Sequence, residues 1–283
     1  MKLRNLLLIA LVAVVFCGCH SYQPTSITVA SYNLRNANGS DSAKGNGWGQ
    51  RYPVIAKMVQ YHDFDIFGTQ ECFIHQLKDM KEALPGYDYI GVGRDDGKEK
   101  GEHSAIFYRT DKFDVIEKGD FWLSETPDVP SKGWDAVLPR ICSWGHFKCK
   151  DTGFEFLFFN LHMDHIGVVA RRESAVLILE KIKQIVGDLP VIVTGDFNGT
   201  VDSEPVTVLT EGGMRNACST AKVVYGPTWS FHDFGRIPVE KRRLIDFIFV
   251  NASVEVERYR TIDDKPDNSY LSDHAPVMAI LKL

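Results

Sequence analysis

Several short polar clusters interrupt the apolar stretches of this sequence, and they hold residue types that hydrolytic chemistry needs. Near the C-terminus, Asp273 and His274 stand side by side in the segment Leu-Ser-Asp-His-Ala-Pro-Val, just before a final apolar run. A carboxylate and an imidazole together can orient water and move protons. One such pair decides little, because most histidines make ordinary hydrogen bonds. Its meaning depends on whether other clusters reach the same place.

The clearest of these clusters follows the apolar run that begins at Val191. In an extended chain, Asp196 and Asn198 would point to the same side while Phe197 turned into the core. Glu71 is likewise the first charge after an apolar stretch. Carboxylates at the edge of a sheet suit a hard cation such as Mg²⁺ or Mn²⁺. The alternative is structural, since Asp-x-Asn is also a common turn or helix cap and Glu71 also precedes a predicted helix.

The elements that must position these groups alternate along the chain. Two stretches rich in Gly and polar residues, 36–49 and 93–102, are the longest predicted loops, and loops of that length are usually functional or mobile. The mixture predicts two packed sheets with helices outside, an α/β sandwich. Hydrophobic periodicity predicts strands at 27–33, 66–70, 87–92, 105–108, 113–121, 141–148, 154–161, 191–194, 245–250, 254–261 and 275–281, and helices at 50–62, 74–84, 169–186 and 203–210.

The N-terminus predicts export. Lys2 and Arg4 precede an apolar stretch that is too short to span a bilayer comfortably, so residues 1–18 are interpreted as a signal peptide. It resembles a bacterial lipoprotein signal with Cys19 as the lipidated first residue, and an ordinary secretory signal is the alternative. We expect residues 19–26 to be a short linker and 27–283 a single domain, anchored in the cell envelope and facing the periplasm or the cell surface. No later stretch is apolar enough for a transmembrane helix.

Charge and cysteine content exclude some functions. The formal net charge is -5, and loss of Lys2 and Arg4 with the signal peptide makes it more negative. Tight non-specific binding of long nucleic acid needs a basic track, which an acidic protein lacks. The cysteines after Cys19 show no zinc-ligand spacing, and we expect buried free thiols. They are Cys72, Cys142, Cys149 and Cys218.

In order, the clusters read SYNLR, TQE, NLHMDH, GDFN, IDFIF and SDH. This ordered set resembles the endonuclease/exonuclease/phosphatase superfamily, which includes DNase I-like nucleases, abasic-site endonucleases, deadenylases, sphingomyelinases and inositol polyphosphate 5-phosphatases. The resemblance covers residues 27 to 283. It implies a DNase I-like four-layer α/β sandwich, with two packed mixed β-sheets flanked by helices, and metal-dependent hydrolysis of phosphate esters.

The resemblance also implies roles for particular residues. His274 would be the general base, and Asp246 rather than the adjacent Asp273 would orient it. Glu71 would be the principal ligand of Mg²⁺ or Mn²⁺, with Asn33 and Asp273 near the ion directly or through water.

On the phosphate side, Asp196 would position the nucleophile and Asn198 would donate to a phosphate oxygen. His162 would contact the phosphate and, if protonated, stabilise the charge of the transition state. Arg140 and Tyr108 are candidate substrate contacts. No role is assigned to Asp164, His165, Arg171 or Arg172.

The function we expect is hydrolysis of phosphate esters, as a phosphodiesterase or phosphatase, by a monomer in the cell envelope. A nuclease that scavenges DNA or RNA is one alternative, and a binding lipoprotein without catalysis is another. The second is disfavoured because no expected catalytic position holds an inert residue. The residues do not specify the substrate or its leaving group.

Overall fold

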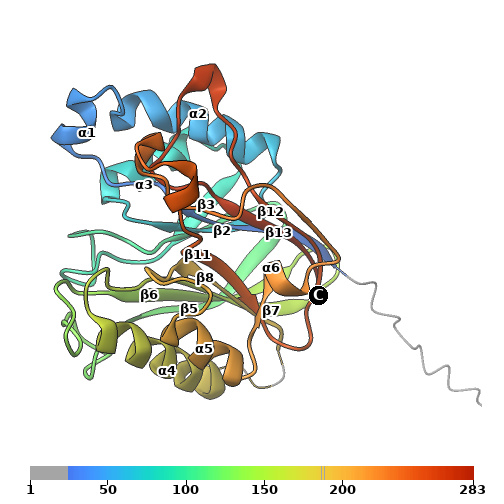
Figure 1. The fold of residues 1–283 in the computed structure, drawn as a ribbon. Helices are drawn as coiled ribbons and strands as arrows, with labels where there is room; N and C mark the ends of the chain where they lie inside the picture. The colour runs from blue at the N-terminus through green and yellow to red at the C-terminus, as the bar shows by residue number, and fades with distance from the viewer. Residues whose placement is uncertain (1–24, 186, 188) are drawn as a thin grey trace, which may run out of the picture.

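The computed structural model describes residues 25–185, 187 and 189–283 (Figure 1). The predicted signal peptide, Cys19 and most of the predicted linker lie outside the described residues, as does Val186 at the end of the longest predicted helix. Within the described part of the chain, no helix is both long and apolar enough to cross a membrane.

Two mixed β-sheets form the centre of the molecule. Strand pairing is parallel between β1 and β2, β10 and β12, and β7 and β8, and the other pairs are antiparallel. The seven-stranded sheet has the order β10 (Val223–Tyr225), β12 (Glu255–Thr261), β13 (Val277–Lys282), β1 (Ser26–Asn33), β2 (Ile66–Gln70), β4 (Ile106–Arg109) and β3 (Tyr87–Ile90). The six-stranded sheet has the order β5 (Phe113–Trp122), β6 (Ile141–Cys149), β7 (Glu155–His162), β8 (Val191–Asp196), β11 (Asp246–Val250) and β9 (Arg215–Asn216).

Helices cover the outer face of each sheet. Figure 1 shows α2 (Trp48–Tyr61) and α3 (Ile74–Ala83) above the seven-stranded sheet, and α4 (Val168–Ile185) and α5 (Glu204–Glu211) below the six-stranded one. The connections carry the short helices α1 (Gly39–Ala43), α6 (Ala217–Thr220), η1 (Asp233–Gly235), η2 (Val239–Lys241) and η3 (Pro266–Asn268).

Alternation along the strands explains the layers. Val29 packs between the two sheets, whereas its neighbour Ala30 packs under α2 and α3. Phe158 and Phe159 divide in the same way between the inter-sheet core and the core beneath α4 and α5. Because successive side chains point to opposite faces, strands that are apolar on both faces must be covered on both. The predicted four-layer α/β sandwich is confirmed.

The main elements that the sequence did not predict are short helices and strands. The predicted loop 36–49 contains α1 and the start of α2, and β9, α6 and β10 were not predicted. Elements of two to five residues carry too little periodicity to be recognised, and their tertiary contacts decide their conformation. Cys142 and Cys149 lie in the single strand β6, and the four cysteines within the described residues are free.

A buried polar bridge fixes the two sheets against each other beside the site. The side-chain oxygen of Asn160 accepts from the Gln70 amide at 2.8 Å and from the Thr194 hydroxyl at 3.0 Å. Its amide nitrogen donates to the carbonyls of Thr69 and Ala105. Gly68 makes room, since a Cβ there would lie 2.1 Å from the Asn160 oxygen. Every side-chain polar atom of Asn160 has a partner in this bridge, and buried hydrogen bonds of this kind favour one arrangement of the sheets.

Candidate active site

An open cleft of about 510 Å³ lies where β1, β2, β7 and β8 end and β11 begins. A volume of this order fits a small-molecule substrate. Asp246 and Asn33 lie beneath the lining, hydrogen-bonded to His274 and Glu71. Predicted site residues that line the cleft are Glu71, Arg140, His162, Asp196, Asn198, Asp273 and His274. The other lining residues are Arg35, Asn36, Glu102, Leu138, His165, Phe231, Asp233 and Ile245.

The strand register brings the predicted groups together. Parallel pairing sets Asn33 beside Gln70 at the ends of β1 and β2, and His162 beside Asp196 at the ends of β7 and β8. Antiparallel pairing sets Asp246, the first residue of β11, opposite Asp196. Six clusters that are distant in sequence therefore meet at one edge of the sandwich.

His274 is paired with Asp246 and not with the adjacent Asp273. The Nδ1 atom of His274 lies 2.8 Å from Oδ2 of Asp246, and both side chains are buried. The other ring nitrogen, Nε2, lies 3.7 Å from Oδ2 of Asp196. A carboxylate behind the ring and a free nitrogen toward the cleft is the arrangement of an oriented general base.

The charges around His274 favour its protonated form. Burial alone lowers its pKa, but the carboxylates of Asp246 and Asp196 raise the pKa of His274 to about 10. Burial and the charge of Asp246 raise the pKa of Asp196 to about 7. The two carboxylates on either side of the ring therefore favour its protonated form. The neutral imidazole expected near pH 7 is therefore not what the protein's own charges favour.

Asn198 is positioned by a turn rather than by an extended strand. β8 ends at Asp196, and the Asn198 backbone has φ 47° and donates its N–H to Oδ1 of Asp196 at 2.9 Å. The amide of Asn198 then donates to Nε2 of His162 at 3.1 Å and to the Met163 carbonyl at 2.9 Å. The predicted strand geometry was wrong here, but Asp196 and Asn198 still reach one place.

His162 is neutral in this setting. Burial and the positive charge of Arg140 lower its pKa well below the ordinary value for histidine. The protonated His162 that we expected to meet the transition state is therefore not favoured. Positive charge beside His162 comes from Arg140 instead, whose side chain is 4% exposed.

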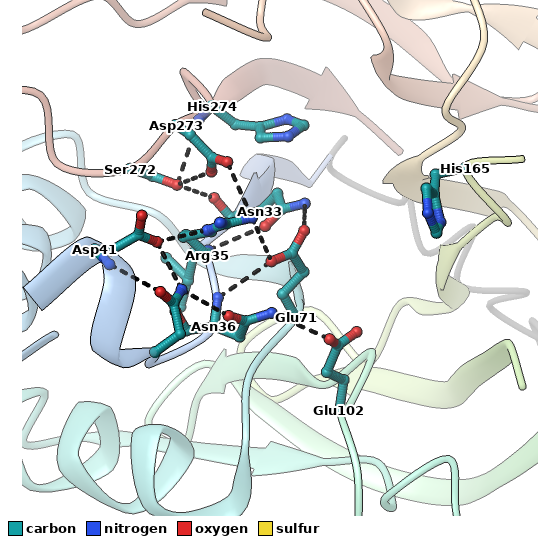
Figure 2. Close-up of polar contacts among 12 residues, drawn as sticks. Asn33, Arg35, Asn36, Asp41, Glu71, Glu102, His165, Ser272, Asp273 and His274 are labelled. Atoms are coloured by element: carbon teal, nitrogen blue, oxygen red, sulfur yellow. Dashed lines mark hydrogen bonds and ion pairs between the residues drawn. The ribbon is translucent and has the colours of Figure 1, made fainter. Parts of the chain in front are cut away.

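The opposite side of the cleft is an acidic wall, defined here as Glu71, Glu102 and Asp273. In Figure 2 the Glu71 carboxylate lies at its centre, held by the Asn33 amide at 3.0 Å and the Asn36 backbone N–H at 3.2 Å. The positive charge nearest to Glu71 and Asp273 is the guanidinium of Arg35, whose Nη1 lies 3.8 Å from Oε2 of Glu71 and 3.5 Å from Oδ2 of Asp273.

The pKa values of Glu102 and Asp273 are raised, which shows that the negative charge of the acidic wall is not fully compensated. Burial raises the pKa of Glu102, and the neighbouring Glu71 raises it further, although Arg94 lowers it. Burial, with the repulsion of Glu71, also raises the pKa of Asp273, against the attraction of His274 and Arg35. A set of oxygen ligands with excess negative charge fits a hard divalent cation.

Two groups of side chains could hold such a cation. One is Glu71 with Asp273, and Asn33 reaches it less directly because its oxygen accepts the Arg35 backbone N–H at 3.0 Å. The other is Asp196, Asp246 and His274, whose ligand atoms lie within 4.8 Å of one another. In the second group the Nδ1 atom of His274 is already bonded to Asp246. The acidic wall is therefore the better cation site.

Backbone strain also marks the cleft. Arg35, Glu71 and Asn198 have φ values of 59°, 66° and 47°, in the left-handed region that side chains other than glycine rarely adopt. Such residues persist only where the surrounding structure holds them, and they gather at functional sites. Asparagine tolerates this conformation, but the residue types of Arg35 and Glu71 do not indicate it.

Tyr108 does not belong to this site. It pairs with Ile66 at the start of β2, far along the strand from the cleft, and its ring packs against Phe147 with the centroids 5.4 Å apart. We therefore withdraw Tyr108 as a substrate contact. Sequence reasoning missed Glu102 and Phe231, which line the cleft from loops, although the charged loop 93–102 was itself recognised.

Comparisons with known proteins agree with this geometry. The model of the Endonuclease/Exonuclease/phosphatase family matches residues 30–274. An endonuclease/exonuclease/phosphatase family protein from Bacteroides thetaiotaomicron is 65% identical, with a TM-score of 0.89 over 93% of this chain and 99% of its own. A mannosyl-6-phosphatase from the same organism is 64% identical, with a TM-score of 0.87 over 90% of this chain and 99% of its own.

A viral relative extends the family further. An uncharacterized protein of Acanthamoeba polyphaga mimivirus is 35% identical over 253 residues, which are 83% of this chain and 92% of that protein. The matched family range includes the cluster of His274, Asp246, Asp196 and Glu71 described above. The chain belongs to the endonuclease/exonuclease/phosphatase family of phosphate-ester hydrolases.

Proposed function

We propose that this protein is a divalent-metal-dependent phosphatase that removes phosphate from sugar phosphates in the bacterial cell envelope. The convergence of His274, Asp196 and Glu71 on one cleft carries the proposal, because phosphoryl transfer needs an oriented water and neutralisation of the phosphate charge. The mannosyl-6-phosphatase that is 64% identical supports a sugar phosphate as the substrate. A mannosyl 6-phosphate is the first candidate.

In the proposed mechanism, Glu71 and Asp273 would hold Mg²⁺ or Mn²⁺, with Asn33 reaching the ion through water. When bound, the cation would neutralise charge on the phosphate and on the carboxylates around His274. Asp196 and Nε2 of His274 face the same point of the cleft and would hold the attacking water between them.

With the charge of the surrounding carboxylates offset by the cation, the His274 ring would be neutral and would take the proton from that water as it attacks phosphorus, and Asp246 would stabilise the resulting imidazolium. Asn198 would keep the His162 ring in place beside the phosphate. The leaving sugar oxygen would receive its proton from solvent or from the same cluster, since the cleft is open.

A nuclease is less well supported by the surroundings of the cleft. Its lining contains the acids Glu71, Glu102, Asp233 and Asp273, and a nucleic-acid backbone needs a basic track instead. The acidic net charge of -5 points the same way.

A substrate panel tests the function. The purified protein would be assayed with mannose 6-phosphate, bis-p-nitrophenyl phosphate, DNA and RNA, with Mg²⁺ or Mn²⁺ and with chelator. Metal-dependent release of phosphate from mannose 6-phosphate is expected. Faster cleavage of DNA or RNA would support the nuclease instead, and no hydrolysis of any member would support a binding protein.

We also propose that the mature protein begins at Cys19, carries a lipid there and is monomeric. Mass spectrometry of the membrane-bound protein would test the anchor, and an unmodified N-terminus elsewhere would contradict it. Light scattering of the protein released from its anchor would test the monomer.

A further inference from the structure

Arg140 is a buried arginine with an unused donor beside the cleft. It stands directly before β6, and its Nε donates to Oδ2 of Asp164 at 3.2 Å. Its Nη2 donates to Nδ1 of His165 at 3.0 Å. Its Nη1 is buried and has no hydrogen-bond partner among the described residues. A buried guanidinium donor without an acceptor costs stability, so a ligand oxygen or a water that supplied the acceptor would be favoured beside it.

Asp164 fixes this arginine in place. Its carboxylate accepts the backbone N–H groups of Ile166 at 3.0 Å and Gly167 at 2.8 Å, and that of Leu138 at 3.4 Å. These bonds and the charge of Arg140 outweigh the effect of burial and lower the pKa of Asp164 to about 2. Asp164 is therefore a permanent anion that ties the segment before β6 to the segment after β7.

His165 presents a second donor to the cleft. Because an arginine can only donate, Nδ1 of His165 must be the acceptor in its bond with Arg140, and a neutral ring then carries its proton on Nε2. The side chain is exposed and lines the cleft. Figure 2 shows it apart from Glu71 and Glu102, on the other side of the site. Nε2 has no partner among the described residues.

Arg140, His162 and His165 are here called the basic wall. The amides of Asn33 and Asn198 are already used within the protein, on Glu71 and Asp196 and on His162 and Met163. Arg140 and His165 both line the cleft, and the Nη1 of Arg140 and the Nε2 of His165 are donors without an acceptor among the described residues.

We propose that Arg140 and His165 bind a non-bridging oxygen of a phosphate monoester and make the enzyme prefer monoesters to diesters. The subsite lies in the cleft of the proposed phosphatase and rests on that function. A monoester dianion has three charged oxygens, whereas a diester replaces one with a neutral ester oxygen and its substituent. A guanidinium donor gains most from the charged oxygen. Asp164 is a positioning residue for this pair.

The test compares two substrates with one leaving group, p-nitrophenyl phosphate and methyl p-nitrophenyl phosphate. Arg140→Gln and His165→Gln are the variants. Arg140→Lys keeps the positive charge but removes the planar guanidinium group that can donate two parallel hydrogen bonds. Arg172→Gln is the matched control, since Arg172 lies on α4, does not line the cleft, and is exposed and paired with Glu173. Thermal unfolding checks that each variant folds, and His165→Gln removes no buried group.

For the monoester, kcat/KM is expected to fall roughly 10- to 100-fold in Arg140→Gln and about 3- to 10-fold in His165→Gln. The diester value should fall by a clearly smaller factor, and Arg172→Gln should match the wild type on both substrates. Equal losses on the two substrates, or none, would overturn the selectivity.

Binding of inorganic phosphate gives a readout that does not need turnover. Calorimetry is expected to show weaker phosphate binding by about 10-fold or more in Arg140→Gln, and unchanged binding in Arg172→Gln. Unchanged phosphate binding in both Arg140→Gln and His165→Gln would overturn the subsite. If neither ester is hydrolysed but phosphate binding still depends on Arg140, the subsite stands and the proposed function fails.

Discussion

The two sides of the cleft differ in what they lack. The acidic wall of Glu71, Glu102 and Asp273 has three carboxylates but two guanidinium groups, Arg35 beside Glu71 and Asp273 and Arg94 paired with Glu102. The basic wall of Arg140, His162 and His165 has donors left over. The carboxylates of the acidic wall can therefore bind a cation, and the free donors of the basic wall can bind an anion.

The contrast also explains how each wall is built. Glu71 follows β2, Glu102 lies in the loop before β4 and Asp273 lies before β13, so the acidic wall belongs to the seven-stranded sheet, whereas the basic wall lies at the start of β6 and the end of β7 in the six-stranded sheet. The buried Asn160 bridge joins the two sheets below them. The site thus lies between the two sheets, and each wall comes from one of them.

The largest effect is expected from His274, which stands between the two walls. His274→Ala should lower kcat by about 10³- to 10⁴-fold, and Asp246→Asn somewhat less, because an amide can hold the ring but cannot stabilise the imidazolium. The double variant should be scarcely worse than His274→Ala, as for groups that act as a unit. Steady-state kinetics of all three variants measures this. Losses that multiply would mean that Asp246 and His274 act independently.

Glu71→Gln removes one negative charge from the acidic wall and leaves the basic wall unchanged. We expect hydrolysis to fall by about 10²- to 10³-fold and the stabilisation by Mg²⁺ or Mn²⁺ in thermal unfolding to be largely lost, since a ligand that binds only the folded state raises the melting temperature. Glu99→Gln is the control, because Glu99 is exposed and its one ion pair among the described residues is with Lys78 of α3. A Glu71 variant with unchanged metal stabilisation would remove Glu71 from the ion.

The smallest effect concerns Asp164, behind the basic wall. A pKa lowered from 3.8 to about 2 corresponds to about 2 kcal/mol of folding stability while the carboxylate is ionised. This contribution is complete above pH ~4 and is lost as the pH falls toward 2, because the unfolded state takes up the proton first.

Urea unfolding of wild type and Asp164→Asn between pH 2 and 7 measures this contribution. The difference should be constant at neutral pH and should shrink below pH ~4. Asp202→Asn, at an exposed turn, is the control and should change stability much less. A difference that is independent of pH down to 2 would mean that charge is not the cause.

The sequence by itself determined the layers and most of the site. Apolar runs such as 191–194 and the helical period of 169–186 place the strands and helices within a few residues, because burial on both faces requires a continuous apolar pattern. Glu71, Asp196, Asp246 and His274 could be identified as site residues from the sequence, because they are polar residues at the ends of predicted apolar strands.

Only the tertiary structure decided how these groups are arranged. The pairing of His274 with Asp246 was expected from the family resemblance, but the approach of Asp196 to the other ring nitrogen and the left-handed turn at Asn198 were not. The same holds for the exclusion of Tyr108 and for the unused donor of Arg140. The residue type determines which hydrogen bonds a side chain can make. Whether a partner lies within reach is decided by the packing of the two sheets, which brings together segments that are distant in the sequence.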